Sequence, residues 1–329
     1  MRSGKLTNEE LQRIILSQLG ANRDDVVLGA GVGEDCAALR FGGDACVIST
    51  DPITAAGSGL GKLAVQVSLN DVAASGAEPL GMLLTVLAPP KATEAEIGEV
   101  VREAAREAAA MGLQIIGGHT EVTDAVRRMV LSSTVVGRAR LDALVRTGGA
   151  RAGDSLVMTK YAGIEGTAIL ACDAAERLRG ALTVQELNEA RTLADSMSVL
   201  SEGQIAARSG ATAMHDATEG GILGAAWELA EASRLGLRLE LSAIPIHPVT
   251  RKLCAALDID PLRLISSGAM LIAHPDGEAL CMALRGQGIA ATVIGEFIEP
   301  PERVLLADRC ASPLAPPDGD EIYKVFRND

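Results

Sequence analysis

The stretch Gln114-Ile115-Ile116-Gly117-Gly118-His119-Thr120-Glu121 places an apolar strand directly before two glycines and a polar tripeptide. A capping box at Thr93-Glu94-Ala95-Glu96 opens an alanine-rich helix that runs to about Met111, just ahead of this strand. Another apolar strand, 82–87, ends at Pro89-Pro90 before the helix begins. This succession of strand, helix and strand predicts a mixed α/β fold with interleaved strands and helices.

The same alternation continues on both sides. A second capping box, Thr7-Asn8-Glu9-Glu10, predicts a helix with Leu11, Ile14, Ile15 and Leu19 on its apolar face. The other elements expected before residue 140 are strands over 26–28, 37–41, 45–49 and 128–136 and a helix over 60–75. They make one mixed α/β domain with its own sheet.

A loop-rich join over residues 148–154 separates this half from a second one, so we expect a domain boundary at about residue 150. The N-terminal domain is then 1–150 and the C-terminal domain 151–329, in line with the length of 329 residues. The expected strands of the second domain are 156–159, 214–216, 237–241, 269–273 and 291–294, and its expected helices are 163–172, 184–207, 220–232 and 277–287.

Composition excludes several classes of function. The net charge of -13 and the pI near 4.9 oppose nucleic-acid binding, which needs clustered basic side chains. Six scattered cysteines without a Cys-x-x-Cys pair indicate reduced thiols in a cytoplasmic protein. No apolar segment is long enough for a membrane span. A polyphosphate ligand would need Mg²⁺ as a bridge, because bare carboxylates repel phosphate.

Three aspartates of the first half stand on separate elements among small and apolar residues. Asp35 follows a glycine-rich turn, Asp51 closes a strand, and Asp71 lies beside Asn70 in the expected helix. Partly buried carboxylates are paired or bind metal, and oxygen ligands from separate elements suit Mg²⁺. We therefore predict that the three aspartates bind Mg²⁺ and that Asn70 contacts the cofactor. A cap for Asp51 and a buried hydrogen-bonded carboxylate for Asp71 are the alternatives.

Two glycine-rich stretches imitate nucleotide motifs without their spacing. Residues 29–33 are followed by Glu34 where a dinucleotide fingerprint has its third glycine, so we interpret them as a turn that presents Asp35. Residues 57–62 lack the opening glycine of a P-loop, and Lys62 is followed by leucine instead of Ser or Thr. Lys62 stays a candidate phosphate contact, with a solvated lysine as the alternative.

Two polar runs supply further candidates. In the first half, glycines let a ligand approach the backbone closely, so Gly117, Gly118, Thr120 and Glu121 are predicted to bind the cofactor. His119 is predicted to be catalytic, as a donor or base near neutral pH, with a hydrogen-bonded structural histidine as the alternative. The remaining histidines, His215, His247 and His274, lack metal-site spacing, so zinc is not expected.

The second run, His215-Asp216-Ala217-Thr218-Glu219-Gly220-Gly221, joins an expected strand to an expected helix, whose N-terminus attracts anions. We predict that Thr218, Gly220 and Gly221 bind the cofactor and that Asp216 and Glu219 are catalytic. A simple N-cap role for Asp216 or Thr218 is the alternative.

Taken in order, these motifs resemble the aminoimidazole ribonucleotide (AIR) synthase-related superfamily, especially its branch around the hydrogenase maturation protein HypE. The matching stations are 33–38, 49–51, 70–79, 117–121, 215–221 and 266–270, which together cover nearly the whole chain. The resemblance implies a two-domain α/β protein that binds Mg-ATP in a cleft and pairs its N-terminal sheet with that of a second subunit. By similarity, Asp35, Asp51 and Asp71 would hold Mg²⁺, residues 117–121 would line the nucleotide, and Asp216, Thr218 and Glu219 would close the site.

The sequence differs from each individual branch of the superfamily, so the resemblance does not identify the acceptor. HypE proteins end in a cysteine that carries a carbamoyl group, whereas this sequence ends Val325-Phe326-Arg327-Asn328-Asp329. Thiamine-monophosphate kinases have an aspartate at the position of His119. We predict an ATP-dependent, Mg²⁺-dependent enzyme, a cytoplasmic homodimer, that phosphorylates or activates an unidentified small-molecule or peptide acceptor. The alternatives are a non-catalytic nucleotide-binding maturation or scaffold partner and a phosphotransferase like the thiamine-monophosphate kinases.

Overall fold

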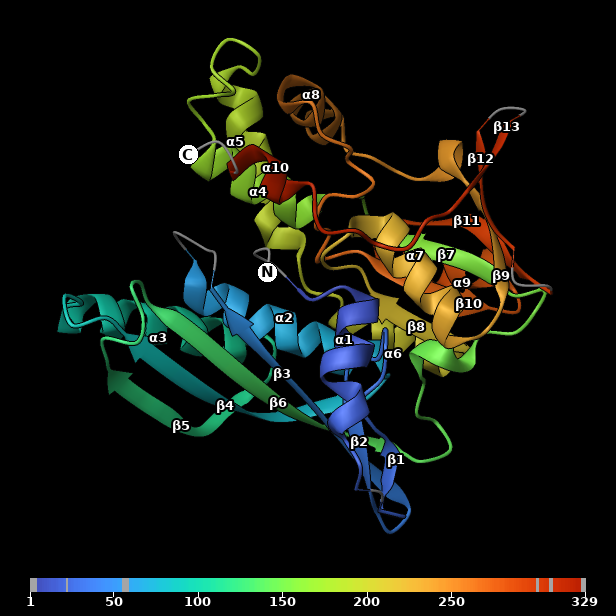
Figure 1. Cartoon of the computed structure of the whole chain (residues 1–329), viewed down its shortest axis with the longest axis horizontal. Helices are drawn as coiled ribbons and strands as arrows, with labels where there is room; N and C mark the ends of the chain where they lie inside the picture. The colour runs from blue at the N-terminus through green and yellow to red at the C-terminus, as the bar shows by residue number, and fades with distance from the viewer. Residues whose placement is uncertain (1–4, 22, 55–58, 300–301, 308–309, 327–329) are drawn as a thin grey trace.

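A computed structural model describes residues 5–21, 23–54, 59–299, 302–307 and 310–326. Its first sheet has the strand order β1-β2-β3-β6-β4-β5, and only the pair β4 and β5 is parallel. The strands are β1 (Val26–Leu28), β2 (Ala37–Phe41), β3 (Asp44–Ile53), β4 (Glu78–Ala88), β5 (Gln114–Val122) and β6 (Val130–Arg140). The predicted mixed sheet is confirmed (Figure 1).

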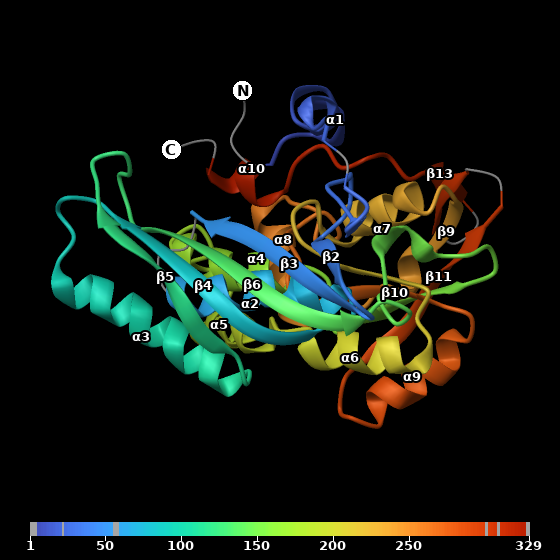
Figure 2. The same cartoon turned by 90° about the horizontal axis from the view of Figure 1, so that it is seen from below.

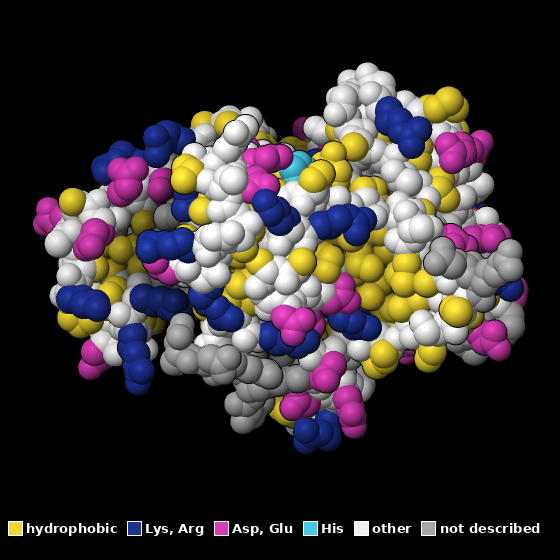
Figure 3. All heavy atoms as spheres, turned by 90° about the horizontal axis from the view of Figure 1, so that it is seen from above, with side chains coloured by type: hydrophobic (Ala, Val, Ile, Leu, Met, Phe, Trp, Pro, Cys, Tyr) yellow, Lys and Arg dark blue, Asp and Glu magenta, His cyan; other side chains and the backbone are white. Residues whose placement is uncertain are grey.

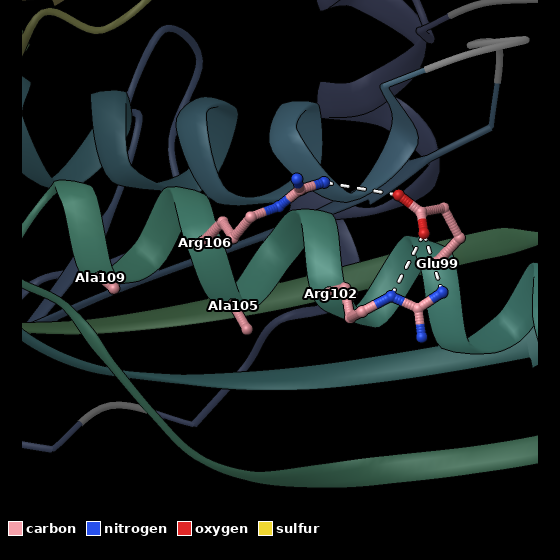
Figure 4. A pocket seen from close by; sticks show the side chains of 5 residues that line it. All are labelled: Glu99, Arg102, Ala105, Arg106 and Ala109. Atoms are coloured by element: carbon pink, nitrogen blue, oxygen red, sulfur yellow. Dashed lines mark hydrogen bonds and ion pairs between the residues drawn. The ribbon is translucent and has the colours of Figure 1, made fainter.

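Two helices pack on one face of this sheet, α2 (Leu60–Ala74) and α3 (Glu94–Ala110). The opposite face is turned to the viewer in Figure 2, with α2 behind the strands. The capping box predicted at Thr93 is present, and the outer surface of α3 carries ion pairs from Glu99 to Arg102 and Arg106 (Figure 4). Such exposed pairs add little stability, so α3 is held mainly by its contact with α2.

The second sheet has the order β13-β12-β9-β11-β7-β10-β8 and is antiparallel except between β9 and β12. Its strands are β7 (Ser155–Thr159), β8 (Ala213–Asp216), β9 (Gly236–Glu240), β10 (Met270–His274), β11 (Ala291–Ile298), β12 (Arg303–Ala307) and β13 (Cys310–Pro313). The helices of this half are α4 (Ile164–Asp173), α5 (Val184–Thr192), α6 (Leu200–Ser209), α7 (Gly221–Ala232), α8 (Pro248–Leu257), α9 (Gly277–Arg285) and α10 (Ile322–Phe326). Sequence patterns did not predict α8, β12 or β13.

The two halves meet where the end of α2 packs on α6. Ala73 and Ala74 belong to the same buried cluster as Met214 of β8. A side chain at Gly203 of α6 would place its Cβ 2.1 Å from the carbonyl oxygen of Ala73, so only glycine permits this approach. This contact fixes α2, which carries Asp71, against the strand that carries Asp216.

The single helix expected over 184–207 is wrong. The chain instead forms α5, a 3₁₀ turn over Leu193–Ser196 and then α6. At the break, the side chain of Asn70 donates to the carbonyl of Met197 (2.8 Å) and accepts from the amide of Val199 (2.9 Å). These bonds satisfy backbone groups that a continuous helix would pair internally.

Several element bounds also differ. Strand β5 continues through Gly117 to Val122, and β3 runs past Asp51 to Ile53, so neither motif terminates its strand. The N-terminal helix α1 (Asn8–Ile14) has its predicted capping box but buries none of its residues. Among the described residues, no helix combines the length and apolarity needed to cross a membrane.

Candidate active site

Acidic side chains from both halves converge where α2 meets β8. Asp51 lies on β3, Asp71 on α2 and Asp216 at the end of β8, while Asp35 comes from the loop before β2. Burial first, and then the charges of Asp216 and Asp51, raise the pKa of Asp71 well above its usual range. The three predicted metal aspartates and the predicted catalytic Asp216 are therefore neighbours, although their individual roles stay predictions.

Asp71 is only 7% exposed and accepts a hydrogen bond from the Ser49 hydroxyl. Its position follows from α2, which packs on the sheet, on α3 and on α6. A carboxylate buried among other carboxylates is costly unless a cation or a proton neutralises it. This pair of elements, β3 and α2, thus presents oxygen ligands of the kind that Mg²⁺ prefers.

The turn before Asp35 works as the sequence predicted. Gly33 has a left-handed backbone (φ 76°), and a Cβ there would lie 3.3 Å from the Cβ of Glu228. The turn brings a carboxylate oxygen of Asp35 to 2.7 Å from Nδ1 of His215. On the other side of the ring, Nε2 of His215 lies 3.2 Å from the Glu228 carboxylate.

His215 is thus held between two carboxylates, and its side chain is only 5% exposed. Burial alone would lower the pKa of His215, but Asp35 and Glu228 outweigh it and raise that pKa well above the usual range. The sequence offered no sign of this arrangement, because Asp35 lies 180 residues from His215 and Glu228 was not a candidate.

Asp216 is 1% exposed, and neither of its carboxylate oxygens has a hydrogen-bond partner among the described residues. Burial and the neighbouring charge of Asp35 raise the pKa of Asp216 to about 7. Buried oxygens are normally paired, so two unpaired ones beside other carboxylates fit a site that takes a cation.

Lys5 is a functional candidate that sequence reasoning missed. Its ammonium donates to the hydroxyl of Thr218 (3.2 Å), and its backbone amide donates to Glu219 (3.1 Å). Desolvation opposes a charged lysine here, but the carboxylates of Asp51, Glu219 and Asp71 outweigh it and raise the pKa of Lys5. The N-terminal segment thus carries a cation to the acidic cluster, across a separation of 213 residues.

The fold itself requires glycine at both positions of the pair in the second polar run. Gly220 and Gly221 both have left-handed backbones (φ 86° and 64°), and a Cβ on Gly221 would lie 2.6 Å from the Leu262 carbonyl oxygen. The amide of Gly220 donates to the Asp320 carboxylate at 2.8 Å. The α7 terminus therefore already binds an anion, which is a side chain of the chain itself. Cofactor contacts from these glycines stay predictions.

Glu219 is held from two sides, since the Tyr323 hydroxyl donates to its other carboxylate oxygen at 2.9 Å. Tyr323 lies in α10, so the C-terminal helix supports the predicted catalytic residue. Glu219 therefore contacts both Lys5 and Tyr323, and Thr218 contacts Lys5. Thr218 and Glu219 thus lie at the edge of the acidic cluster that Lys5 approaches.

Residues 117–121 lie away from this cluster within one copy of the chain. Gly118 is in register with Leu84, Leu84 with Ser133, and Ser133 with Asp51. Three strand spacings therefore separate Gly118 from Asp51, about 14 Å. His119 is exposed, with Nε2 3.4 Å from Glu121.

The glycine at 118 is required by the sheet itself, since a Cβ would lie 1.9 Å from the Leu84 carbonyl oxygen. Two other candidate residues of the N-terminal half, Lys62 and Asn70, already have partners within the chain. Lys62 pairs with Asp195 at 2.8 Å, and Asn70 spans the α5–α6 break. Residues 57 and 58 of the P-loop-like stretch lie outside the described residues. The nucleotide roles of this group stay predictions.

Glu165, near the start of α4, is a buried acid that the sequence did not single out. Burial raises the pKa of Glu165 to about 7, although a hydrogen bond with Ser267 opposes the shift. The folded pKa exceeds the usual 4.5, so the contribution of Glu165 to the stability of the folded state is complete below pH 4.5 and declines as the pH rises through 7.

We expect Glu165→Gln to remove this decline, making the variant more stable than the parent at pH 8 by up to about 3 kcal/mol and nearly equal at pH 4. Thermal unfolding across this pH range measures the effect, with exposed Glu94→Gln as the control. A variant that keeps the parental pH slope would contradict the assignment.

Comparison with known proteins identifies relatives over most of the chain. The N-terminal domain profile of AIR synthase related proteins matches residues 33–139, and the C-terminal domain profile matches residues 151–307. Carbamoyl dehydratase HypE of Rhodobacter capsulatus is 31% identical over 275 residues, which cover 82% of this chain and 78% of that protein.

Solved structures share the fold. A crystal structure of a HypE–HypF complex aligns with a TM-score of 0.78 at 20% identity, covering 93% of this chain and 99% of that one. A crystal structure of the hydrogenase maturation protein HypE in complex with ATP aligns with a TM-score of 0.67 at 22% identity, covering 94% and 92%. The chain belongs to the AIR synthase related protein family.

Proposed function

We propose that this protein binds ATP with Mg²⁺ at the acidic cluster and transfers the terminal phosphoryl group to an acceptor, or activates an acceptor oxygen with it. The observation that carries the proposal is the convergence of Asp51, Asp71 and Asp216 from both halves, with both oxygens of Asp216 unpaired. The ATP complex of the structurally similar HypE supports the choice of nucleotide.

The proposed role of each residue in the site follows from its chemistry. Asp35, Asp51 and Asp71 would hold Mg²⁺, which supplies the positive charge that draws phosphate oxygens and stabilises charge in transfer. Asp216, which the sequence predicts to be catalytic, offers two unpaired oxygens beside them that could also contact the ion. Lys5 is placed to contact a phosphate oxygen, because its ammonium is near enough to Asp51 and Asp71 for their charges to raise its pKa. Glu219, fixed by Tyr323 and the Lys5 amide, is placed to orient the acceptor or accept its proton.

Calorimetric titration of ATP with and without Mg²⁺ tests nucleotide binding, and ADP release on the same samples tests turnover. We expect binding only with Mg²⁺. ADP release that one acceptor accelerates would establish an enzyme, and thiamine monophosphate, small carboxylates and carbamoylated peptides are the first acceptors to screen. Tight binding without turnover would favour a nucleotide-binding scaffold, and the structurally similar HypE of the HypE–HypF complex supports the choice of a protein partner. No binding in either condition would contradict the proposal.

The proposal includes a homodimer built on the open face of the first sheet (Figure 2). Large apolar side chains on this sheet are exposed: Leu80 by 47%, Leu83 by 42%, Ile116 by 56% and Val122 by 56%. Exposed apolar patches rimmed by polar residues mark interaction sites. Residues 117–121 lie on the β5 edge of this sheet, so their predicted contact with nucleotide would be made at the interface.

Leu83→Lys is expected to convert a dimer to a monomer at micromolar concentration, because it places a charge in the centre of this apolar face. Sedimentation velocity measures the change. Val184→Lys, at a 76% exposed position on α5, is the matched control and should leave the dimer intact. A parent protein that sediments as a monomer would refute the dimer without affecting the ATP site.

Two further assignments belong to this proposal. The division of the chain near residue 150 is supported by the sheet boundaries, since the first sheet ends at Arg140 and the second begins at Ser155. A cytoplasmic location is supported by six free cysteines. On the face opposite the open sheet, Lys and Arg side chains are interspersed with Asp and Glu (Figure 3), which does not favour a polyanionic partner there.

A further inference from the structure

A buried carboxyl group at the start of α4 has one oxygen without a partner. Glu165 is 6% exposed, and its Oε2 atom has no hydrogen-bond partner among the residues that the structure describes. The side chain of Ser267, in the turn before β10, forms a hydrogen bond with the same carboxyl group. Because buried oxygens are normally paired, Oε2 points to a bound group that donates a hydrogen bond to it.

The position of Glu165 is fixed by the chain segment before β10. The amide of Gly166 donates to the carbonyl of Ile265 at 3.0 Å. A side chain at Gly166 would collide with Leu264, since its Cβ would lie 2.4 Å from that side chain. The start of α4 therefore lies directly on this segment, which keeps Glu165 beside Ser267.

Two further carboxylates surround Glu165. The charges of Asp320 and Glu219 raise the pKa of Glu165, and the charge of Lys5 lowers it. Tyr323 also lies near, because the charge of Glu165 contributes to the raised pKa of its phenol. Helix α10, which carries Tyr323, packs on α4 (Figure 1). We call Glu165, Glu219 and Asp320 the α4–α10 acids.

The other two α4–α10 acids already have donors on the chain. Asp320 accepts from two backbone amides, one of them that of Gly220 at 2.8 Å. Glu219 accepts from a backbone amide and from the hydroxyl of Tyr323. A further donor that enters among these acids would therefore pair with Oε2 of Glu165.

The charge of the surroundings favours a cationic donor. Each of the α4–α10 acids can carry a negative charge, whereas Lys5, the base that acts on Glu165, also acts on Asp51 and Asp71. In the proposed ATP complex Lys5 contacts a phosphate oxygen, which leaves the α4–α10 acids with less compensation. A positively charged nitrogen would both neutralise their charge and pair Oε2.

We propose that Oε2 of Glu165 binds a protonated nitrogen, an ammonium or guanidinium group, and that the acceptor of the proposed reaction is a small molecule carrying that group. Lys5 acts on both Glu165 and the aspartates of the ATP site, so a molecule bound at Glu165 lies beside that site. The identity of the cation as the acceptor rests on the proposed function. Its binding to Glu165 needs no nucleotide, so the two are tested separately.

The test is thermal unfolding of the full chain with increasing putrescine or butane-1,4-diol, its neutral counterpart, in excess Mg²⁺ that competes for the metal aspartates. We expect putrescine to raise the unfolding temperature of the parent at pH 8 and the diol to leave it unchanged. Glu165→Gln keeps the shape of the side chain without its charge and should weaken putrescine binding about 10-fold or more. Exposed Glu94→Gln is the matched control and should bind putrescine as the parent does.

The pH dependence tests the same group in the parent. A cation binds the ionised form of Glu165, whose pKa is raised to about 7, so putrescine should bind several-fold more tightly at pH 8 than at pH 6. Asp320, with a pKa raised to about 6, also titrates here. The part of the pH slope that Glu165→Gln removes belongs to Glu165.

The inference is overturned if putrescine and the diol act alike on the parent, if Glu165→Gln binds putrescine as tightly as the parent, or if binding is no tighter at pH 8. Calorimetry with Mg-ATP on the same parent protein separates this inference from the proposed function. A protein that binds Mg-ATP but not putrescine lacks the cation site alone. One that binds putrescine through Glu165 but not Mg-ATP has the cation site without the proposed function.

Discussion

Asp71→Asn is expected to abolish Mg²⁺-dependent ATP binding while making the ligand-free protein more stable. Asparagine has the same shape and can still accept the hydrogen bond from Ser49, but it is a poor ligand for Mg²⁺. Loss of one of the few ligands of the ion should weaken Mg-ATP binding at least about 100-fold, or about 2.7 kcal/mol. An affinity loss coupled to a stability gain distinguishes a ligand from a packing residue.

The stability gain follows from the charge. Since the pKa of Asp71 in the folded state is raised, the folded protein pays a growing penalty as the pH rises above the usual aspartate range. Replacing the carboxylate should therefore stabilise the protein by about 1 to 3 kcal/mol at pH 7.5 and by almost nothing near pH 4. Thermal unfolding without ligand at both pH values measures this difference.

The matched control is Asp142→Asn, because Asp142 is exposed and pairs with Arg140 at the surface. Calorimetry on the parent and both variants, with and without Mg²⁺, reports the affinities. Unchanged Mg-ATP affinity in Asp71→Asn would remove Asp71 from the ligand set. A lower stability instead of a higher one would mean that the carboxylate is satisfied in the ligand-free protein.

The sequence predicted the elements that carry the site because their signals are local. Capping boxes at Thr7 and Thr93 start helices as expected, and the turn at Gly33 presents Asp35. The isolation of Asp51 and Asp71 among apolar residues also indicated correctly that these carboxylates are shielded, since Asp71 is buried and Asp51 is half-buried. Such features depend on a few neighbouring residues, which is why one sequence suffices to find them.

What the sequence could not predict depends on long-range contacts. The cofactor contact of Asn70 stays a prediction, but no local pattern indicated that its amide pairs with the backbone at Met197 and Val199, where a helix that periodicity alone would continue is broken. The cofactor contact of Gly118 also stays a prediction, and the close approach of Leu84, which by itself requires glycine there, could not be foreseen from the motif. In both cases a tertiary contact more than thirty residues away decides what a local motif does.

Lys5→Met is expected to reduce the preference of the protein for Mg-ATP over Mg-ADP and to slow ATP turnover about 100-fold or more. In the ligand-free protein Lys5 is held by Thr218 and Glu219 and faces the carboxylates of Asp51 and Asp71. A bound metal would neutralise those carboxylates, which leaves the Lys5 ammonium available for a phosphate oxygen. A fixed cation at the transferring phosphoryl group stabilises the charge that develops in transfer.

Comparing ATP with ADP makes the result independent of the unidentified acceptor. If Lys5 contacts the terminal phosphate, Lys5→Met should weaken Mg-ATP binding about 10-fold and leave Mg-ADP binding nearly unchanged, whereas Lys5→Arg should retain most of the difference. Lys91→Met, which removes an exposed lysine from the turn between β4 and α3, should behave like the parent. Equal losses for both nucleotides would make Lys5 a structural tie between the N-terminal segment and α7. If Lys5→Met binds both nucleotides as tightly as the parent, the phosphates lie away from Thr218 and Glu219. These two residues would then take no part in a reaction at Asp216.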